Sequence, residues 1–96
     1  MLEADPGDAF LLYALAQELA KASDFSGAVE HYDRCLAADP NYLYAYFHKA
    51  MALRDRDAPG DLALAAATLR TGVDRARAAK DTKALSELSG LLDQIE

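Results

Sequence analysis

A short segment of this chain occurs twice, and this echo constrains the fold more than any other feature. LEADP at residues 2–6 reappears as LAADP at residues 36–40. Three further pairs follow the same shift: Leu12 and Tyr46, Ala16 and Ala50, and Leu19 and Leu53. The shift matches the period of about 34 residues that is typical of a helix-turn-helix unit stacked on its neighbours. The sequence therefore predicts an internal repeat.

Apolar residues recur at steps of three and four in five segments, which is the spacing of amphipathic helices. The expected helices cover residues 10–20, 28–36, 43–53, 62–79 and 82–95. Polar residues or Pro and Gly interrupt the pattern between them, most clearly at residues 39–41 and 57–61. No segment alternates as a strand does, so the predicted class is all-α, built from antiparallel helix hairpins.

Size and charge narrow the class of function. The chain has 96 residues, which suffices for a single domain over residues 1–96. Its net charge is -6, and residues 1–48 hold the whole deficit, with eight acids against two bases. Binding to a nucleic-acid backbone would have to overcome this average repulsion. A loose basic run (Arg70, Arg75, Arg77, Lys80 and Lys83) is interpreted as a solvated helix face.

The location expected from the sequence is the cytoplasm. A single cysteine, Cys35, cannot form an intramolecular disulfide, which fits a reducing compartment. No run approaches the roughly 18 apolar residues of a membrane span. The N-terminus also lacks the basic start and apolar run of a signal peptide. No membrane association is predicted.

The period and its residue types resemble the tetratricopeptide repeat (TPR), whose pattern places small residues where helices cross. The positions that match are Ala16, Ala28, Cys35, Ala50, Ala65 and Gly72. Leu12, Leu15, Leu19 and Tyr32 supply the bulky positions of the first repeat. The second repeat departs from the pattern at Lys49 and has Arg77 in place of a proline. The layout is similar to stand-alone bacterial TPR proteins of about one hundred residues.

This resemblance implies a short right-handed TPR superhelix of two repeats and a capping helix. The first repeat would cover residues 9–42, the second repeat would cover residues 43–80, and the capping helix would cover residues 82–95. Residues 1–8 would be the tail of an upstream helix in a longer natural chain. In such arrays a closing helix covers the last exposed apolar face.

The family lines its concave face with the first helix of each hairpin, and the outward residues there form the predicted partner-binding groove. They are Phe10, Tyr13, Gln17, Tyr44, Phe47, Met51 and Arg54. The capping helix would add Lys83, Ser86, Gly90 and Asp93. Chaperone-binding members grip a carboxylate with Lys, Arg and Asn on this face, but Tyr13 and Gln17 replace two of these ligands. An apolar helix or an aromatic-bearing peptide fits better, with micromolar affinity. The alternative is that some of these aromatic residues pack on an upstream helix or on one another.

For each candidate catalytic or metal-binding residue, a structural role is the stronger interpretation. His31 and Cys35 share a helix face, but Cys35 falls on a small-residue packing position and is expected to be buried and inert. His48 has no ligand-spaced neighbour and is expected at the surface or the groove rim. Residues 55–60 resemble a calcium loop, yet Pro59 replaces a ligand. Asp24 and Asp61 are assigned to turns or caps.

The predicted function is a protein–protein interaction module that holds a peptide or helix of a partner protein, without catalysis, metal or cofactor. The alternative is a structural repeat segment of a larger TPR protein that has no binding function of its own. The resemblance does not identify the partner. It also leaves open whether the chain associates with itself to form a homo-oligomer.

Overall fold

The computed structural model describes residues 7–96, which form five α-helices. These are α1 (Ala9–Lys21), α2 (Phe25–Ala38), α3 (Leu43–Arg56), α4 (Asp61–Ala79) and α5 (Thr82–Ile95). The predicted all-α class is confirmed, and α2 begins three residues before the expected segment. Residues 1–6, with the first copy of the echo and most of the expected upstream tail, lie outside the described residues.

Aspartate side chains start three of the helices. The Asp8 carboxylate accepts the Phe10 amide at 2.9 Å, and the Asp24 carboxylate accepts the Gly27 amide at 2.9 Å. Asp81 accepts the amide of Ala84 in the same way, at 3.0 Å. Each bond satisfies an amide that the first helical turn leaves without a partner. Part of the acid excess therefore serves to begin helices.

The turn between α3 and α4 is fixed by an ion pair between the partly exposed Arg56 and the buried Asp61. Asp57 and Gly60 adopt left-handed backbone angles, with φ of 53° and 85°. The Arg56 guanidinium donates two hydrogen bonds of 2.8 Å to the Asp61 carboxylate, which also accepts the Ala58 amide at 2.9 Å. The sequence predicts only a turn or cap role for Asp61. The structure adds an ion pair, because the turn brings Arg56 back over the start of α4.

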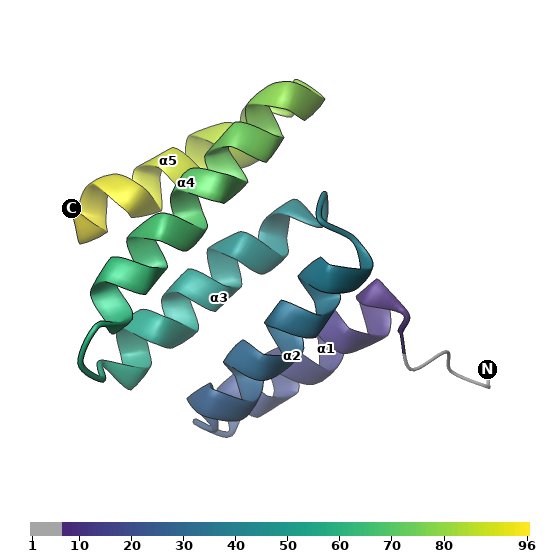
Figure 1. Cartoon of the computed structure of the whole chain (residues 1–96), viewed down its shortest axis with the longest axis vertical. Helices are drawn as coiled ribbons and strands as arrows, with labels where there is room; N and C mark the ends of the chain where they lie inside the picture. Colours follow the sequence, from purple (N-terminus) through teal and green to yellow (C-terminus); the bar gives the residue numbers. More distant parts are fainter. Residues whose placement is uncertain (1–6) are drawn as a thin grey trace.

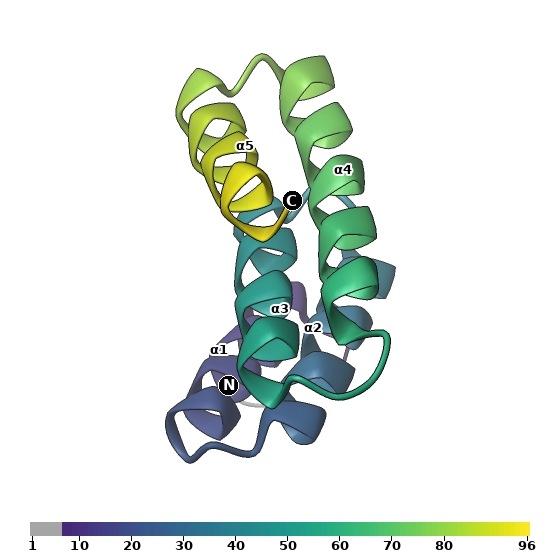
Figure 2. The same cartoon turned by 90° about the vertical axis from the view of Figure 1, so that its left-hand side faces the viewer.

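The helices form two layers. Each helix packs antiparallel on the next, and α3 also contacts α1 and α5. Figure 2 shows α1, α3 and α5 in one layer and α2 and α4 in the other. The molecule measures 40 × 32 × 17 Å, so the helices form a flat stack (Figure 1). This is the short stack of antiparallel helix hairpins that the repeat predicted.

Small residues mark the places where helices approach one another. All six predicted crossing positions are buried, and the five with side chains are 0% exposed. Tyr32, Leu53, Leu69 and Leu88 fill the space between the crossings. Leu15 departs from its expected packing role, since it is 43% exposed. The reason is that no described helix lies on its side of α1.

Candidate functional site

The structure divides the seven predicted groove residues into three groups. Phe47, Met51 and Arg54 border a hollow between α3 and α5. Tyr13 and Gln17 are engaged with α2, and Tyr44 is bonded to α5. Phe10, on the first turn of α1, is 68% exposed. The seven residues therefore lie on one layer but do not form one continuous strip.

The hollow between α3 and α5 has a volume of about 280 Å³. Its lining residues are Phe47, Met51, Arg54, Glu87, Gly90, Leu91 and Gln94. Gly90 opens this space, because a Cβ built on it would meet nothing within 4 Å. The volume falls just below the roughly 300–1,000 Å³ of small-molecule pockets. It suits a single large apolar side chain of a partner.

Polar groups stand at the edges of this apolar floor. The Arg54 guanidinium lies 3.9 Å from the Asp55 carboxylate, which is too long for a strong ion pair. Among the described residues, the Arg54 guanidinium therefore forms only this long ion pair. Tyr44 donates a hydrogen bond of 3.1 Å to Glu87. Desolvation first, and then this bond, raise the pKa of the Tyr44 hydroxyl, which stays protonated.

An aromatic cluster occupies the same layer nearer α1. The Tyr13 ring lies 4.9 Å from Tyr42, 5.9 Å from Tyr32 and 5.7 Å from His48, measured between ring centroids. The Tyr32 hydroxyl donates to the Gln17 side chain. Such ring pairs contribute about 0.5–1.5 kcal/mol each beyond their buried area. Tyr13 thus packs against its neighbours and is partly exposed.

His48 is more enclosed than the surface or rim position expected from sequence. Its ring lies 5.3 Å from Phe47 and 6.4 Å from Tyr32. Desolvation lowers the pKa of the imidazole, and the nearby Glu87 carboxylate opposes that shift. The lowered pKa favours the neutral imidazole, and the ring joins the aromatic cluster to the Phe47 side of the hollow.

The capping helix contributes side chains that sequence analysis missed. Lys83, Ser86, Gly90 and Asp93 were expected there, and only Gly90 borders the hollow. Glu87, Leu91 and Gln94 complete it, because the hollow lies in the crevice between the two helices, beside the outward row of α5. The alignment that superposes Tyr46 on Leu85 carries Phe47 to Ser86 and Met51 to Gly90, so it does not point to Glu87, Leu91 or Gln94.

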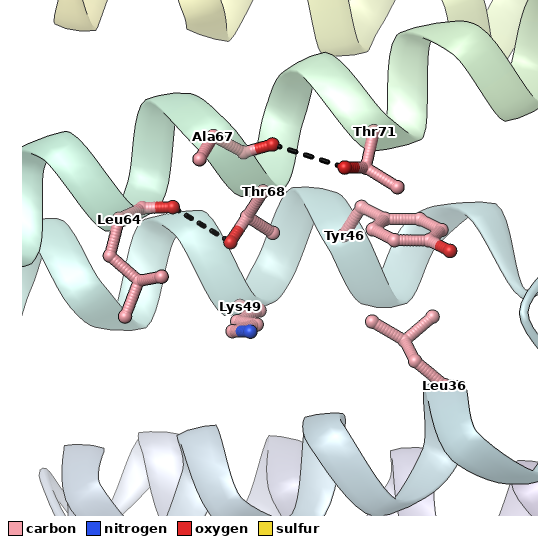
Figure 3. Close-up of a pocket in the computed structure, with 7 residues that line it drawn as sticks. All are labelled: Leu36, Tyr46, Lys49, Leu64, Ala67, Thr68 and Thr71. Carbon is pink, nitrogen blue, oxygen red and sulfur yellow. Dashed lines mark hydrogen bonds between the residues drawn. The ribbon is translucent and has the colours of Figure 1, made fainter.

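A second pocket of about 230 Å³ lies on the opposite side, between α2 and α4. Figure 3 shows the residues that line it: Leu36, Tyr46, Lys49, Leu64, Ala67, Thr68 and Thr71. The hydroxyls of Thr68 and Thr71 donate to carbonyls of their own helix, at 2.8 and 3.3 Å. Lys49, the departure from the repeat pattern, pairs with Asp33 at 2.6 Å. The polar groups that line this pocket are therefore paired within the protein, so this pocket is the weaker candidate for a binding site.

The residues considered for chemistry have structural partners. His31 donates from Nδ1 to the Gly27 carbonyl at 2.9 Å. Burial, followed by the charge of Asp39, raises the pKa of the Cys35 thiol to about 11, so the nucleophilic thiolate is scarce at pH 7. Within residues 7–96, no cluster of three His, Cys, Asp or Glu residues could hold a metal. None of the helices described in that range is long and apolar enough to span a membrane.

Comparison with known proteins agrees with this architecture. No family model matches the chain. No curated protein matches it significantly either. A TPR domain protein from Salinibacter ruber, solved by NMR, is 32% identical, with a TM-score of 0.85 over 97% of this chain and 91% of that chain. A crystal structure of a TPR domain protein from the same organism is 31% identical, with a TM-score of 0.80 over 92% of this chain and 96% of that one.

This chain belongs to the tetratricopeptide-repeat family. The TPR fold is an interaction fold without catalysis of its own, and it suggests that this protein is a protein-interaction module. The hollow between α3 and α5 lies in the layer of α1, α3 and α5, which contains the first helix of each hairpin.

Proposed function

We propose that this TPR protein binds a peptide or helix of a partner protein in the groove formed by α1, α3 and α5. In this proposal, residues 9–42 and 43–80 act as two repeats and residues 82–95 as the capping helix. The observation that carries it is the hollow of about 280 Å³ with an apolar floor and one loosely paired arginine. A reducing compartment such as the cytoplasm suits its buried free thiol.

The partner would anchor one large apolar side chain on Phe47, Met51 and Leu91. An acidic group next to that anchor would reach the Arg54 guanidinium, which offers several donors. The contact area is small, so the affinity would be micromolar and would depend strongly on the central anchor. Tyr44 and Glu87, which already bond to each other, would border the bound peptide.

Gly90 allows a direct test of this hollow. Gly90→Leu fills the space, and the fold accepts a Cβ at this position. Peptides would be selected against the parent chain from a displayed random library, and their affinities measured by fluorescence anisotropy. Loss of a central anchor costs about 2 kcal/mol, so Gly90→Leu and Met51→Glu should weaken binding roughly thirtyfold.

Two control variants accompany these measurements. Gly90→Ala leaves most of the hollow open, and Glu30→Ala changes an exposed residue of α2 away from the groove. Both should bind as the parent does, and all variants should first melt like the parent. Failure to select any peptide would instead support the alternative of a structural repeat segment, and equal binding by Gly90→Leu would contradict the hollow as the binding site. Tyr13→Glu is unsuitable here, because Tyr13 packs in the aromatic cluster.

A further inference from the structure

The hollow between α3 and α5 carries opposite charges at its two ends. Both helices run in the same direction (Figure 1 and Figure 2). Glu87 lines the end near their N-termini, where it accepts the hydrogen bond from Tyr44, and Arg54 lines the other end, in the last turn of α3. Arg54 follows Phe47 by seven residues on α3, and Gln94 follows Glu87 by seven on α5. Seven helical residues extend about 10 Å, which separates the two charged ends along the helix axes.

Neither Glu87 nor Arg54 forms a short ion pair within the described part of the chain. The Tyr44 hydroxyl is a neutral donor, and none of the ion pairs among residues 7–96 includes Glu87. Desolvation lowers the pKa of the neighbouring His48, which favours its neutral form. Arg54 lies 3.9 Å from Asp55, beyond the distance of a strong charge-assisted bond. The hollow therefore presents a negative end and a positive end on either side of an apolar floor.

The apolar floor favours a helix over an extended peptide. Phe47, Met51 and Leu91 have no polar side-chain groups, and the backbone groups of two helices bond within each helix. An extended segment on this floor would leave some of its amides and carbonyls without partners, whereas a helix bonds its own. On a helix, residues i and i+7 lie on one face about 10 Å apart, with i+3 and i+4 between them. This spacing matches the two charged ends and the floor between them.

We propose that the partner binds through a short helix that carries an acid at position i, a large apolar residue at i+3 or i+4, and a base at i+7. This inference rests on the proposed function and specifies the chemistry of its partner. The acid pairs with Arg54, the base pairs with Glu87, and the apolar residue enters the hollow. In this order the bound helix runs antiparallel to α3 and α5, so its dipole is opposed to theirs. The order also suits the bound helix itself, because acids stabilise the first turn of a helix and bases the last.

Selection from a displayed library of single-helix peptides tests this order. The library keeps a helical scaffold and randomises positions i, i+3, i+4 and i+7. It is selected against the parent and against Arg54→Glu with Glu87→Lys, which exchanges the two charges. The parent should enrich the order acid, apolar, base, and the exchanged variant should enrich the reverse. By fluorescence anisotropy, two peptides that differ only in this order should differ roughly threefold or more in affinity, because two ion pairs are replaced by two like-charge contacts.

Two further variants separate charge recognition from folding. Asp74→Lys with Arg77→Glu exchanges an exposed ion pair on α4 at constant net charge, and it should enrich the same order as the parent. Glu87→Gln keeps an acceptor for the Tyr44 hydroxyl and should lose only the preference for a base at i+7. Peptides that bind the parent but not Gly90→Leu, and that show no charge order or the reverse order, overturn this inference and leave the proposed function standing. The same order selected by the exchanged variant also overturns it. Failure to select any peptide overturns both.

Discussion

Gly72 lets α4 pack closely against α3 and α5. A Cβ at this position would lie 2.8 Å from Cβ of Tyr46 and 3.2 Å from a methyl group of Leu88. Gly72→Ala gains up to about 1 kcal/mol of helix propensity but forces these buried side chains apart. Overpacking typically costs about 1–3 kcal/mol, so we expect a net loss of stability in urea unfolding.

Gly90→Ala is the matched control for that measurement. It makes the same substitution inside a helix, where the new Cβ meets nothing within 4 Å. The gain in helix propensity is then not opposed by any overpacking, so the variant should be more stable by about 0.5–1 kcal/mol. Equal shifts for the two glycines would contradict the close approach of α4 and α3.

The Arg56–Asp61 pair predicts a dependence of stability on pH. Hydrogen bonds from Arg56, together with the Ala58 amide, outweigh burial and lower the pKa of Asp61 from 3.8 to about 2. A carboxyl with a lowered folded pKa stabilises the fold above its unfolded pKa and loses that contribution as pH falls. The parent should therefore lose this stability between about pH 4 and pH 2.

Thermal melts of the parent and Asp61→Asn measure this effect. Asp61→Asn should melt lower than the parent at pH 7, because it leaves Arg56 without a charged partner. The difference should shrink as pH falls from 4 to 2, since the parent carboxyl becomes neutral there. Asp74→Asn, which changes an exposed acid on the same helix, should show no comparable convergence. A difference that stays constant across this range would contradict the role of the ion pair.

At the residue scale, sequence predicted the small crossing positions but not the polar pairs. Ala16, Ala28 and Cys35 were found because helix crossings tolerate few residue types. Lys49 was seen only as a departure from the pattern, because its partner Asp33 lies on another helix. The enclosure of His48 was missed for the same reason, as its ring contacts come partly from α1 and α2. Pairings between helices carry no local sequence signal.

At the scale of elements, the capping helix completes the core. Ala84, Leu88 and Leu91 of α5 are buried at 0%, 0% and 5% exposure, against α4 and α3. Arg70 on α4 also forms an ion pair with Glu96, at the end of the chain. Deletion of residues 82–96 should expose these apolar faces, destabilise the remaining helices and cause aggregation.

Light scattering and circular dichroism of the shortened chain check this prediction. The point variant Leu88→Ala keeps the helix and opens a cavity beneath it, which should cost about 2–5 kcal/mol. Ser86→Ala, on the exposed side of α5, is the control and should be nearly neutral. A shortened chain that remains soluble, monomeric and equally stable would contradict the structural role of α5.

The helices were predictable from periodicity, whereas only some of the residues that line the hollow between α3 and α5 were. Helix α3 supplied its expected members Phe47, Met51 and Arg54. Helix α5 supplied Glu87, Leu91 and Gln94 beside the expected Gly90, because the hollow lies in the crevice between α3 and α5 and not along the outward row of α5. The helical period predicts which residues face outward. Which residues line the crevice between two helices also depends on how the neighbouring helix is rotated about its axis.

At the scale of the whole molecule, α3 holds the stack together. It contacts α1, α2, α4 and α5, whereas α1 and α5 each contact two helices (Figure 2). In a linear array each unit depends on its immediate neighbours, so the ends open at lower free energy than the centre. Amide hydrogen exchange should therefore be slowest in α3, around Ala50 and Leu53, and faster in α1 and α5.

Two cavity-forming variants separate global from local opening. Leu53→Ala removes a fully buried side chain at the centre and should lower protection throughout the molecule by about 2–5 kcal/mol. Leu12→Ala removes a side chain of similar burial from α1, and it should accelerate exchange mainly in α1 and α2 while α4 and α5 keep more of their protection. Exchange measured residue by residue by NMR distinguishes these patterns. If Leu12→Ala lowered protection equally in all five helices, the chain would open as one cooperative unit, and the description as a stack with weaker ends would be wrong.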